Sequence, residues 1–280
     1  MSSINTNNGA MVALQTLKSI NSDLSETQNQ ISTGKKVASA KDGSAIWAIA
    51  KVMEADVAGF KSVQDSLAVG EATVAVASAG AEQIVSVLEE MKELAVAATS
   101  ETADFAKIES ELAEKTAQIV SVIGASQFNG VNLLATDADG NGGTALTVLS
   151  SLDRVGNSAP TISTISVATE DFEANLDVAS RTSIADTATA ATAVGEIEAF
   201  LQTAINGAAD LGASGKRIEG QGEFIGKLTD AMKSGIGALV DADMEEASAR
   251  LQALQTQQQL GIQALSIANQ APQSILSLFR

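Results

Sequence analysis

The side chains that most often carry catalysis in proteins are missing from this chain. Its 280 residues include no His and no Cys, which excludes imidazole bases, thiol nucleophiles, disulfides and the commonest zinc ligands. Neighbouring carboxylates remain, in three pairs: Glu89 with Glu90, Asp241 with Asp243, and Glu245 with Glu246. Such pairs can serve acid–base chemistry, but their helical spacing favours solvated helix faces. We therefore predict no catalytic site and no enzyme.

A glycine-rich stretch at residues 139–143 has a composition that suggests ligand binding. A phosphate cradle would need a Lys-Ser or Lys-Thr pair after it, and a calcium loop would need a longer series of liganding carboxylates. Because the sequence supplies neither, the pattern favours a turn. We expect no metal and no cofactor.

The charge of the chain is strongly negative, with 34 acidic and 17 basic residues and a net charge of −17. It repels nucleic-acid phosphates and anionic lipid, so we expect no nucleic acid and no membrane as partners. The longest uncharged apolar run, residues 72–81, is far shorter than the ~20 residues that span a bilayer. Residues 1–8 lack the basic and apolar segments of a cleavable signal, so export would use another route.

Long helices must position these residues, because the only prolines lie at 160 and 272. Apolar residues recur with alternating spacings of three and four, which is typical of coiled-coil helices. The predicted seams cover residues 10–31, 46–95, 105–122, 194–239 and 240–268, and the last helix should end near Pro272. At 1.5 Å per residue, the second helix would be ~80 Å long and must lie along partner helices.

The two outermost seams contain polar residues at positions that should be buried. The first runs through Ala10, Leu14, Leu17, Asn21, Leu24, Gln28 and Ile31 and should stop at Gly34. The last contains Gln258. The three amides either fix the register of the paired helices or are tolerated at loosely packed positions.

Residues 136–183 differ from the rest, because Asp, Gly, Asn, Ser and Thr dominate and residues 146–148 and 162–167 are typical of short strands. We predict a mainly α fold: a long helical coiled-coil rod built from N- and C-terminal segments, with a small β-hairpin insert at its tip. The predicted domains are a terminal coiled coil for polymerisation (1–43 and 236–280), a helical rod core (44–135 and 184–235) and the variable insert (136–183).

The terminal seams cannot bury enough apolar area on their own. At about 25 cal/mol per Å², a narrow stripe barely offsets the ~1 to 2 kcal/mol of ordering entropy per residue. If copies stack, the remaining apolar side chains, such as Met11, Ile262 and Ile267, are covered by neighbours. Folding of these ends would then accompany assembly, and a contact that does not close on itself gives a helical filament.

Several motifs resemble those of bacterial flagellins, in the short form found in alphaproteobacteria. Residues 4–7 (INTN), 31–37 (ISTGKKV), 39–42 (SAKD) and 48–50 (AIA) resemble the amino-terminal signature. Residues 128–134 (FNGVNLL) resemble the turn after the second core helix, and residues 268–273 (ANQAPQ) and 276–280 (LSLFR) the carboxyl-terminal ending. The likeness covers roughly residues 1–135 and 190–280.

The resemblance implies a secreted, extracellular subunit of the flagellar filament. Its expected partners are further copies of itself, sister flagellins, hook-associated and cap proteins, an export chaperone and the type III export apparatus. The residues expected at the polymerisation interface lie in both terminal segments: Ile4, Asn7, Met11, Leu14, Leu17, Leu24, Ile31, Leu251, Leu254, Gln258, Leu265, Ala268, Asn269, Gln270, Leu276, Leu278 and Arg280.

Two further surfaces follow from the resemblance. Glu89, Glu90, Lys92 and Leu94 occupy the segment that the animal flagellin-specific Toll-like receptor senses, and Glu90 replaces a family Arg, so we expect weak receptor activation. Exposed flagellin inserts often carry O-linked sugars. The candidate acceptors are Thr144, Thr147, Thr161, Ser163, Thr164 and Ser166, with a plain solvated loop as the alternative.

Other functions remain open at this point. A hook–filament junction protein shares the flagellin ends but would be present in few copies. The signalling rod of a chemoreceptor is also Ala- and Glu-rich and based on heptads, but it would have a helical hairpin where residues 136–183 lie. An enzyme is disfavoured because His and Cys are absent.

Overall fold

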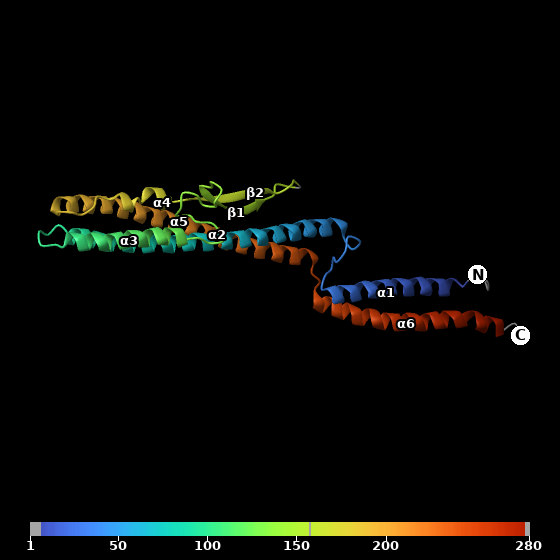
Figure 1. The fold of residues 1–280 in the computed structure, drawn as a ribbon. Helices are drawn as coiled ribbons and strands as arrows, with labels where there is room; N and C mark the ends of the chain where they lie inside the picture. Colours follow the sequence, from blue (N-terminus) through green and yellow to red (C-terminus); the bar gives the residue numbers. More distant parts are fainter. Residues whose placement is uncertain (1–6, 157, 278–280) are drawn as a thin grey trace. The chain divides into compact units, whose positions relative to one another are not determined.

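The computed structural model describes residues 7–156 and 158–277, with side chains as far as residue 270, and it is dominated by helices (Figure 1). In chain order the elements are α1 (Asn8–Thr33), α2 (Ser44–Ala97), α3 (Phe105–Ala125), β1 (Ala145–Asp153), β2 (Thr161–Ala168), α4 (Phe172–Asn175), the 3-10 turn η1 (Val178–Ser180), α5 (Thr187–Val240) and α6 (Met244–Ser277). The predicted mainly α fold with one small antiparallel hairpin is therefore confirmed.

Packing divides the chain into two units. The terminal unit consists of Met1–Ala55 with Ala231–Arg280, and the central unit of Asp56–Asp230. Both α2 and α5 contribute residues to each unit. No helix in the described part of the chain is long and apolar enough to cross a membrane.

In the central unit α2 and α5 run antiparallel, since Gly215 faces Val74 and Gly226 faces Gln64. From Phe60 to Ala95, every position of the predicted α2 seam is buried. Apolar side chains of α5, including Ile197, Leu211 and Ile218, are buried as well. The spacing of apolar residues thus gave the correct face of this helix over ten turns.

The hairpin of β1 and β2 is held in antiparallel register by pairs such as Val148 with Ile165, with an irregularity between Leu149 and Ser151. It lies along α2 and α5, and the prediction that it sits at the tip is wrong. The reason is a pair of glycines on α2. An added Cβ at Gly59 would be 2.5 Å from Leu152, and one at Gly70 would be 2.5 Å from Val148, so each glycine receives a strand side chain.

The sequence prediction missed a compact turn after the hairpin, formed by α4 and η1. Phe172, at the start of α4, is buried against Gly207, where an added Cβ would be 2.5 Å from its ring. Its N–H donates to the Leu134 carbonyl at 2.8 Å, and the Glu170 N–H donates to the Leu133 carbonyl at the same distance. These bonds tie the segment after α3 to the segment after the hairpin.

In the terminal unit α1 and α6 lie side by side and antiparallel (Figure 1), with Leu17 against Gly261 and Asn21 against Gln258. The predicted face of α1 is wrong by about one residue. Leu14, Asn21 and Gln28 are exposed, whereas Ala13, Ile20 and Thr27 are more buried; Asn21 still bonds Gln258 from the edge of the contact. Ala10, Leu17, Leu24 and Ile31 belong to both faces, so the spacing alone could not separate them.

The predicted end of the last helix near Pro272 is also wrong, because α6 continues to Ser277. Proline is tolerated there if the carbonyl four residues earlier finds another donor. Asn7 supplies that donor: its Nδ2 lies 2.7 Å from the Ala268 carbonyl oxygen.

At the other end of the terminal unit, a small core joins the chain segments. Val37, Ala50 and Val240 are buried together, with Trp47 and Ile236 packed against them. The Lys36 N–H donates to the Val240 carbonyl at 2.7 Å, and the Ala242 N–H to the Gly34 carbonyl at 2.9 Å. Gly34 ends α1 as predicted, with φ of +69°, a conformation that favours glycine.

Candidate assembly interface

The α1/α6 pair leaves most of its apolar surface uncovered. Across residues 7–33 and 244–270, the buried side chains are Thr27, Ala247 and Leu254. Large apolar side chains on both helices are exposed, by 65% for Val12, 55% for Ile262 and 69% for Ile267. An apolar surface of this kind marks an interaction site.

The predicted interface residues fall into groups within this pair. Leu17, Leu24, Ile31, Leu251, Leu265 and Ala268 are half-buried between the helices, and Leu254 is buried. Met11, Leu14, Asn269 and Gln270 are exposed. Ile4, Leu278 and Arg280 lie outside the described residues, as does the side chain of Leu276.

The sequence reading missed Val12 and Leu260, which are exposed by 65% and 62%. Both are large apolar residues that lie off the predicted seams, Val12 two positions from Leu14 and Leu260 next to Gly261. A large apolar residue outside the seam is the signal that could have found them, because a helix that packs on one partner needs only one apolar face.

Polar bonds supplement the sparse packing of the pair. Gln258 Nε2 donates to Asn21 Oδ1 at 2.6 Å, so two of the predicted amides do contact each other, although Asn21 is exposed. Asn7 accepts from the Ala10 N–H through Oδ1 at 3.0 Å and caps α1. Its Nδ2 reaches α6.

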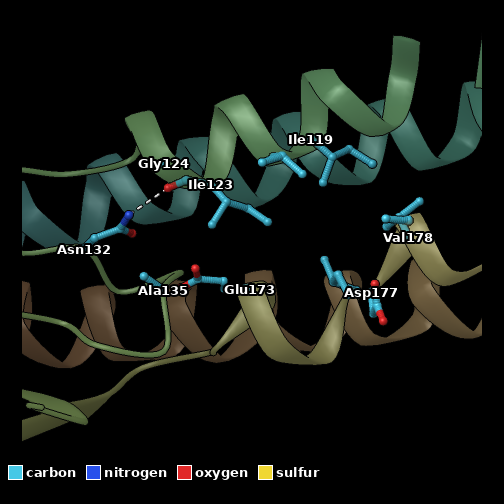
Figure 2. Close-up of a pocket in the computed structure, with 11 residues that line it drawn as sticks. Ile119, Ile123, Gly124, Asn132, Ala135, Glu173, Asp177 and Val178 are labelled. Carbon is cyan, nitrogen blue, oxygen red and sulfur yellow. Dashed lines mark hydrogen bonds between the residues drawn. The ribbon is translucent and has the colours of Figure 1, made fainter. Parts of the chain in front are cut away.

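A cavity of about 320 Å³ lies in the central unit, between α3 and the α4/η1 turn (Figure 2). Its walls are largely apolar, with Ile119 and Ile123 on one side. Its polar groups already have partners: Asn132 Nδ2 donates to the Ile123 carbonyl at 2.7 Å, Glu173 accepts from the Thr136 N–H, and Asp177 accepts from Ser180. It therefore presents no group poised for chemistry.

The predicted carboxylate pairs do not form a site. Glu89, Glu90, Asp241, Asp243, Glu245 and Glu246 are all exposed. Within the described residues no three acidic side chains are grouped so that they could hold a metal ion. In the loop 139–143, Asp139 accepts backbone N–H groups of Asn141 and Gly143, which is the arrangement of a turn.

Among the carboxyl groups of the central unit with shifted pKa values are Glu109 and Glu170. Burial raises the pKa of Glu109, but hydrogen bonds from Arg181, at 2.8 and 3.0 Å, and from the Ile184 N–H outweigh it and hold the pKa below its usual value. For Glu170, burial and then the nearby charge of Asp210 raise the pKa. Both groups sit where the insert rejoins the helices.

Comparison with known families identifies the family of the chain. The model of the bacterial flagellin N-terminal helical region matches residues 4–139, and that of the bacterial flagellin C-terminal helical region matches residues 194–279. The chain belongs to the bacterial flagellin family. Flagellin FljK of Caulobacter vibrioides is 44% identical over 283 residues, with 100% of this chain and 99% of the relative covered.

Other flagellins agree. FljM of the same bacterium is 43% identical with the same coverage, and a flagellin of Brucella melitensis is 42% identical over the whole of both chains. A crystal structure of Bacillus cereus flagellin aligns with 59% of this chain and 88% of its own, with 21% identity and a TM-score of 0.48. The expected resemblance to alphaproteobacterial flagellins is confirmed.

As a flagellin, the protein is a structural subunit of the extracellular flagellar filament and is not an enzyme. The exposed apolar faces of α1 and α6 belong to the two matched helical regions. The matches favour a filament subunit over the hook–filament junction protein and the chemoreceptor rod.

The remaining predicted flagellin surfaces lie in the central unit. Glu89 and Glu90 are exposed, Leu94 is half-buried, and ion pairs join Lys92 to Glu198 and Glu90 to Lys115. Of the candidate acceptor hydroxyls, Thr144, Thr147, Thr161, Thr164 and Ser166 are exposed and Ser163 is half-buried. Ser163 and Thr161 donate to the side chain and the carbonyl of Asp153, respectively.

Proposed function

We propose that α1 and α6 polymerise as one layer and that neighbouring subunits supply the packing they lack. The observation that carries this proposal is the burial of only three side chains across the described residues 7–33 and 244–270. As part of this proposal, residues 1–43 and 236–280 assemble, residues 44–135 and 184–235 form the helical core, and residues 136–183 form the variable insert.

The energetics favour ordering of the terminal helices α1 and α6 during assembly. Ordering a residue costs ~1 to 2 kcal/mol, whereas about 25 cal/mol is gained for each Å² of apolar surface buried. A side chain as exposed as Ile267 or Val12 contributes little to the isolated protomer. When it is covered by a neighbour, it contributes about 1.5 to 3 kcal/mol, and such gains are repeated in every subunit.

The same exposed helices are suited to the other expected partners. Sister flagellins with the same helical regions could alternate with this chain in a mixed filament. We assign hook-associated and cap proteins to the two ends of such a filament, and the export chaperone and type III apparatus to the unassembled chain. The chaperone and export apparatus would cover the apolar face of α1 and α6 before assembly. The hook-associated and cap proteins would cover it at the filament ends.

Two surface roles remain proposals for the central unit. Weak activation of the flagellin-specific Toll-like receptor is supported by the negative charge of Glu90 and its ion pair with Lys115, and a reporter-cell assay would reveal a full response if this is wrong. O-glycosylation best suits Thr144, Thr147, Thr161, Thr164 and Ser166, which are exposed, and intact-mass measurement of native filaments would detect it.

The test of assembly uses a matched pair of exposed isoleucines. Ile267 on α6 is 69% exposed, and Ile162 on β2 is 64% exposed. We expect Ile267→Asn to raise the critical concentration for elongation from filament seeds at least tenfold, because a covered apolar contact is lost. Ile162→Asn should elongate like the unchanged protein.

Monomer melting, followed by circular dichroism, serves as the folding control and should be similar for both variants. If Ile267→Asn elongates as well as Ile162→Asn, the polymerisation layer is misassigned.

A further inference from the structure

The Asn7 side chain makes two bonds at once, one within α1 and one to α6. Its Oδ1 accepts from the Ala10 N–H at 3.0 Å, and its Nδ2 donates to the Ala268 carbonyl at 2.7 Å. Exchanging the two amide atoms would set a donor against the N–H and an acceptor against the carbonyl, so the orientation is determined by both partners. Asn7 therefore does more than cap a helix.

The partner carbonyl is a particular one. In an α-helix the carbonyl of residue 268 would accept from the N–H of residue 272. Residue 272 is Pro, which has no N–H, yet α6 runs through it to Ser277. The proline thus releases the acceptor that Asn7 uses.

The bond from Asn7 to the Ala268 carbonyl lies at one end of the α1/α6 pair, where few other contacts align the helices. At the opposite end of the α1/α6 pair, the Ala242 N–H donates to the Gly34 carbonyl. Between the two ends only Thr27, Ala247 and Leu254 are buried within the described residues. A pair with so little packing depends more on specific polar bonds for its alignment.

The first turn of α1 also approaches α6 closely. A Cβ added to Gly9 would lie 4.0 Å from the Cβ of Ala268 and 3.4 Å from Asn7 Oδ1. The cap, this glycine and Ala268 therefore form one small contact, which closes the pair at the end far from Gly34.

We propose that Asn7 is a positioning residue that clasps the start of α1 to α6 through the carbonyl freed by Pro272. This inference rests on the proposed assembly role of the two helices. The clasp aligns their far ends for contact with neighbouring subunits, and it makes the order of each terminal helix depend on the other. A plain N-cap would do neither.

The experiment separates the clasp from the cap. Asp and Ser cap helices as well as Asn does, but Asp has no donor and Ser is too short to reach α6. We expect Asn7→Asp and Asn7→Ser in the full chain to raise the critical concentration for seeded elongation about fivefold, the usual effect of one lost hydrogen bond. Asn8→Asp, the same change at an exposed neighbouring position, should leave it unchanged.

A second change tests the role of the proline. Pro272→Ala restores an N–H for the Ala268 carbonyl, so in that background Asn7→Ser should change the critical concentration less than twofold. Hydrogen exchange in filaments gives an independent reading: Asn7→Ser should speed exchange in α6 after residue 268, although the substitution lies on α1.

The outcomes are distinct. If the unchanged chain and Asn8→Asp fail to elongate, the assembly role itself is wrong. If they elongate and Asn7→Asp and Asn7→Ser match them, the clasp is refuted. A fivefold effect of Asn7→Ser that persists with Pro272→Ala refutes the use of the freed carbonyl.

Discussion

At the scale of single residues, one partly buried ion pair holds the insert to α3. The Arg181 side chain is 5% exposed and bonds Glu109 at 2.8 Å, while Glu109 also accepts the Ile184 N–H at 3.0 Å. Because the pKa of Glu109 is lowered in the folded protein, this stabilisation is present above the unfolded pKa and is lost as the pH falls through the folded one. Acidic pH therefore weakens the contact of Arg181 and Ile184 with Glu109 on α3.

The pKa of Glu170 is shifted in the opposite direction, upward. Burial and the charge of Asp210 raise its pKa, so the folded protein binds this proton more tightly than the unfolded chain does, and the ionised group lowers stability at neutral pH. We expect Glu170→Gln to raise the melting temperature at pH 7 by about 1 to 3 °C. Calorimetry across pH should show the gain shrinking as the pH falls and Glu170 becomes protonated.

The control for this change is Glu111→Gln, at an exposed carboxylate of α3, which should leave the melting temperature nearly unaltered. A loss of stability for Glu170→Gln at pH 7 would contradict the assigned repulsion.

The sequence alone could not reveal these contacts. Arg181 and Glu109 are 72 residues apart, and no periodicity links a turn residue to a helix face. The separation of Asn7 from Ala268 is 261 residues, although both lie in segments that carried the flagellin resemblance. The motifs included Asn7 and Ala268 but neither Arg181 nor Glu109, and the folded chain was needed to pair each set.

At the scale of elements, the glycines of α2 determine where the hairpin lies. A Cβ at Gly70 would be 2.5 Å from Val148, whereas one at Gly220 on α5 meets nothing within 4 Å. We expect Gly70→Ala to destabilise the protein by about 1 to 3 kcal/mol, because it overpacks the contact. Gly220→Ala should stabilise it by roughly 0.5 to 1 kcal/mol through helix propensity.

Urea unfolding of the two variants measures both effects. Since each replaces a helical Gly by Ala, the change in helix propensity is matched, and the difference reports the strand contact. Equal stabilities would mean that the hairpin does not rest on Gly70.

Helix prediction succeeded in α2. Every position of its seam from Phe60 to Ala95 is buried, and Val69, an apolar residue off the seam, is 50% exposed. In α1, Ala13 and Leu14 are both apolar and both fit the spacing, so the partner helix decided between them. Pro272 predicted a helix end because sequence rules assume that its missing bond is not replaced.

At the scale of the whole molecule, the protomer combines a well-packed central unit with a sparsely packed terminal one. We expect hydrogen exchange in the monomer to be slow in the α2/α5 seam of the central unit and fast throughout α1 and α6, since few of their side chains are buried. On polymerisation, protection of α1 and α6 should rise at least a hundredfold. Mass spectrometry of peptides from monomer and filament would measure the change.

Slow exchange of both terminal helices in the monomer would contradict the coupling of order to assembly. The peptide 60–95 is the internal reference, since its protection should be high in both states.

The connection between the two strands has one more consequence. The chain leaves β1 at Asp153 and re-enters β2 at its partner Thr161, and Val155 between them is 82% exposed. Closing a longer loop costs only about 0.6 kcal/mol for each doubling of its length. Foreign domains grafted at Val155, with the ion pair of Arg154 and Asp56 on α2 retained, would leave the helices in place, so filaments of this protein could serve as scaffolds that display dense arrays of cargo.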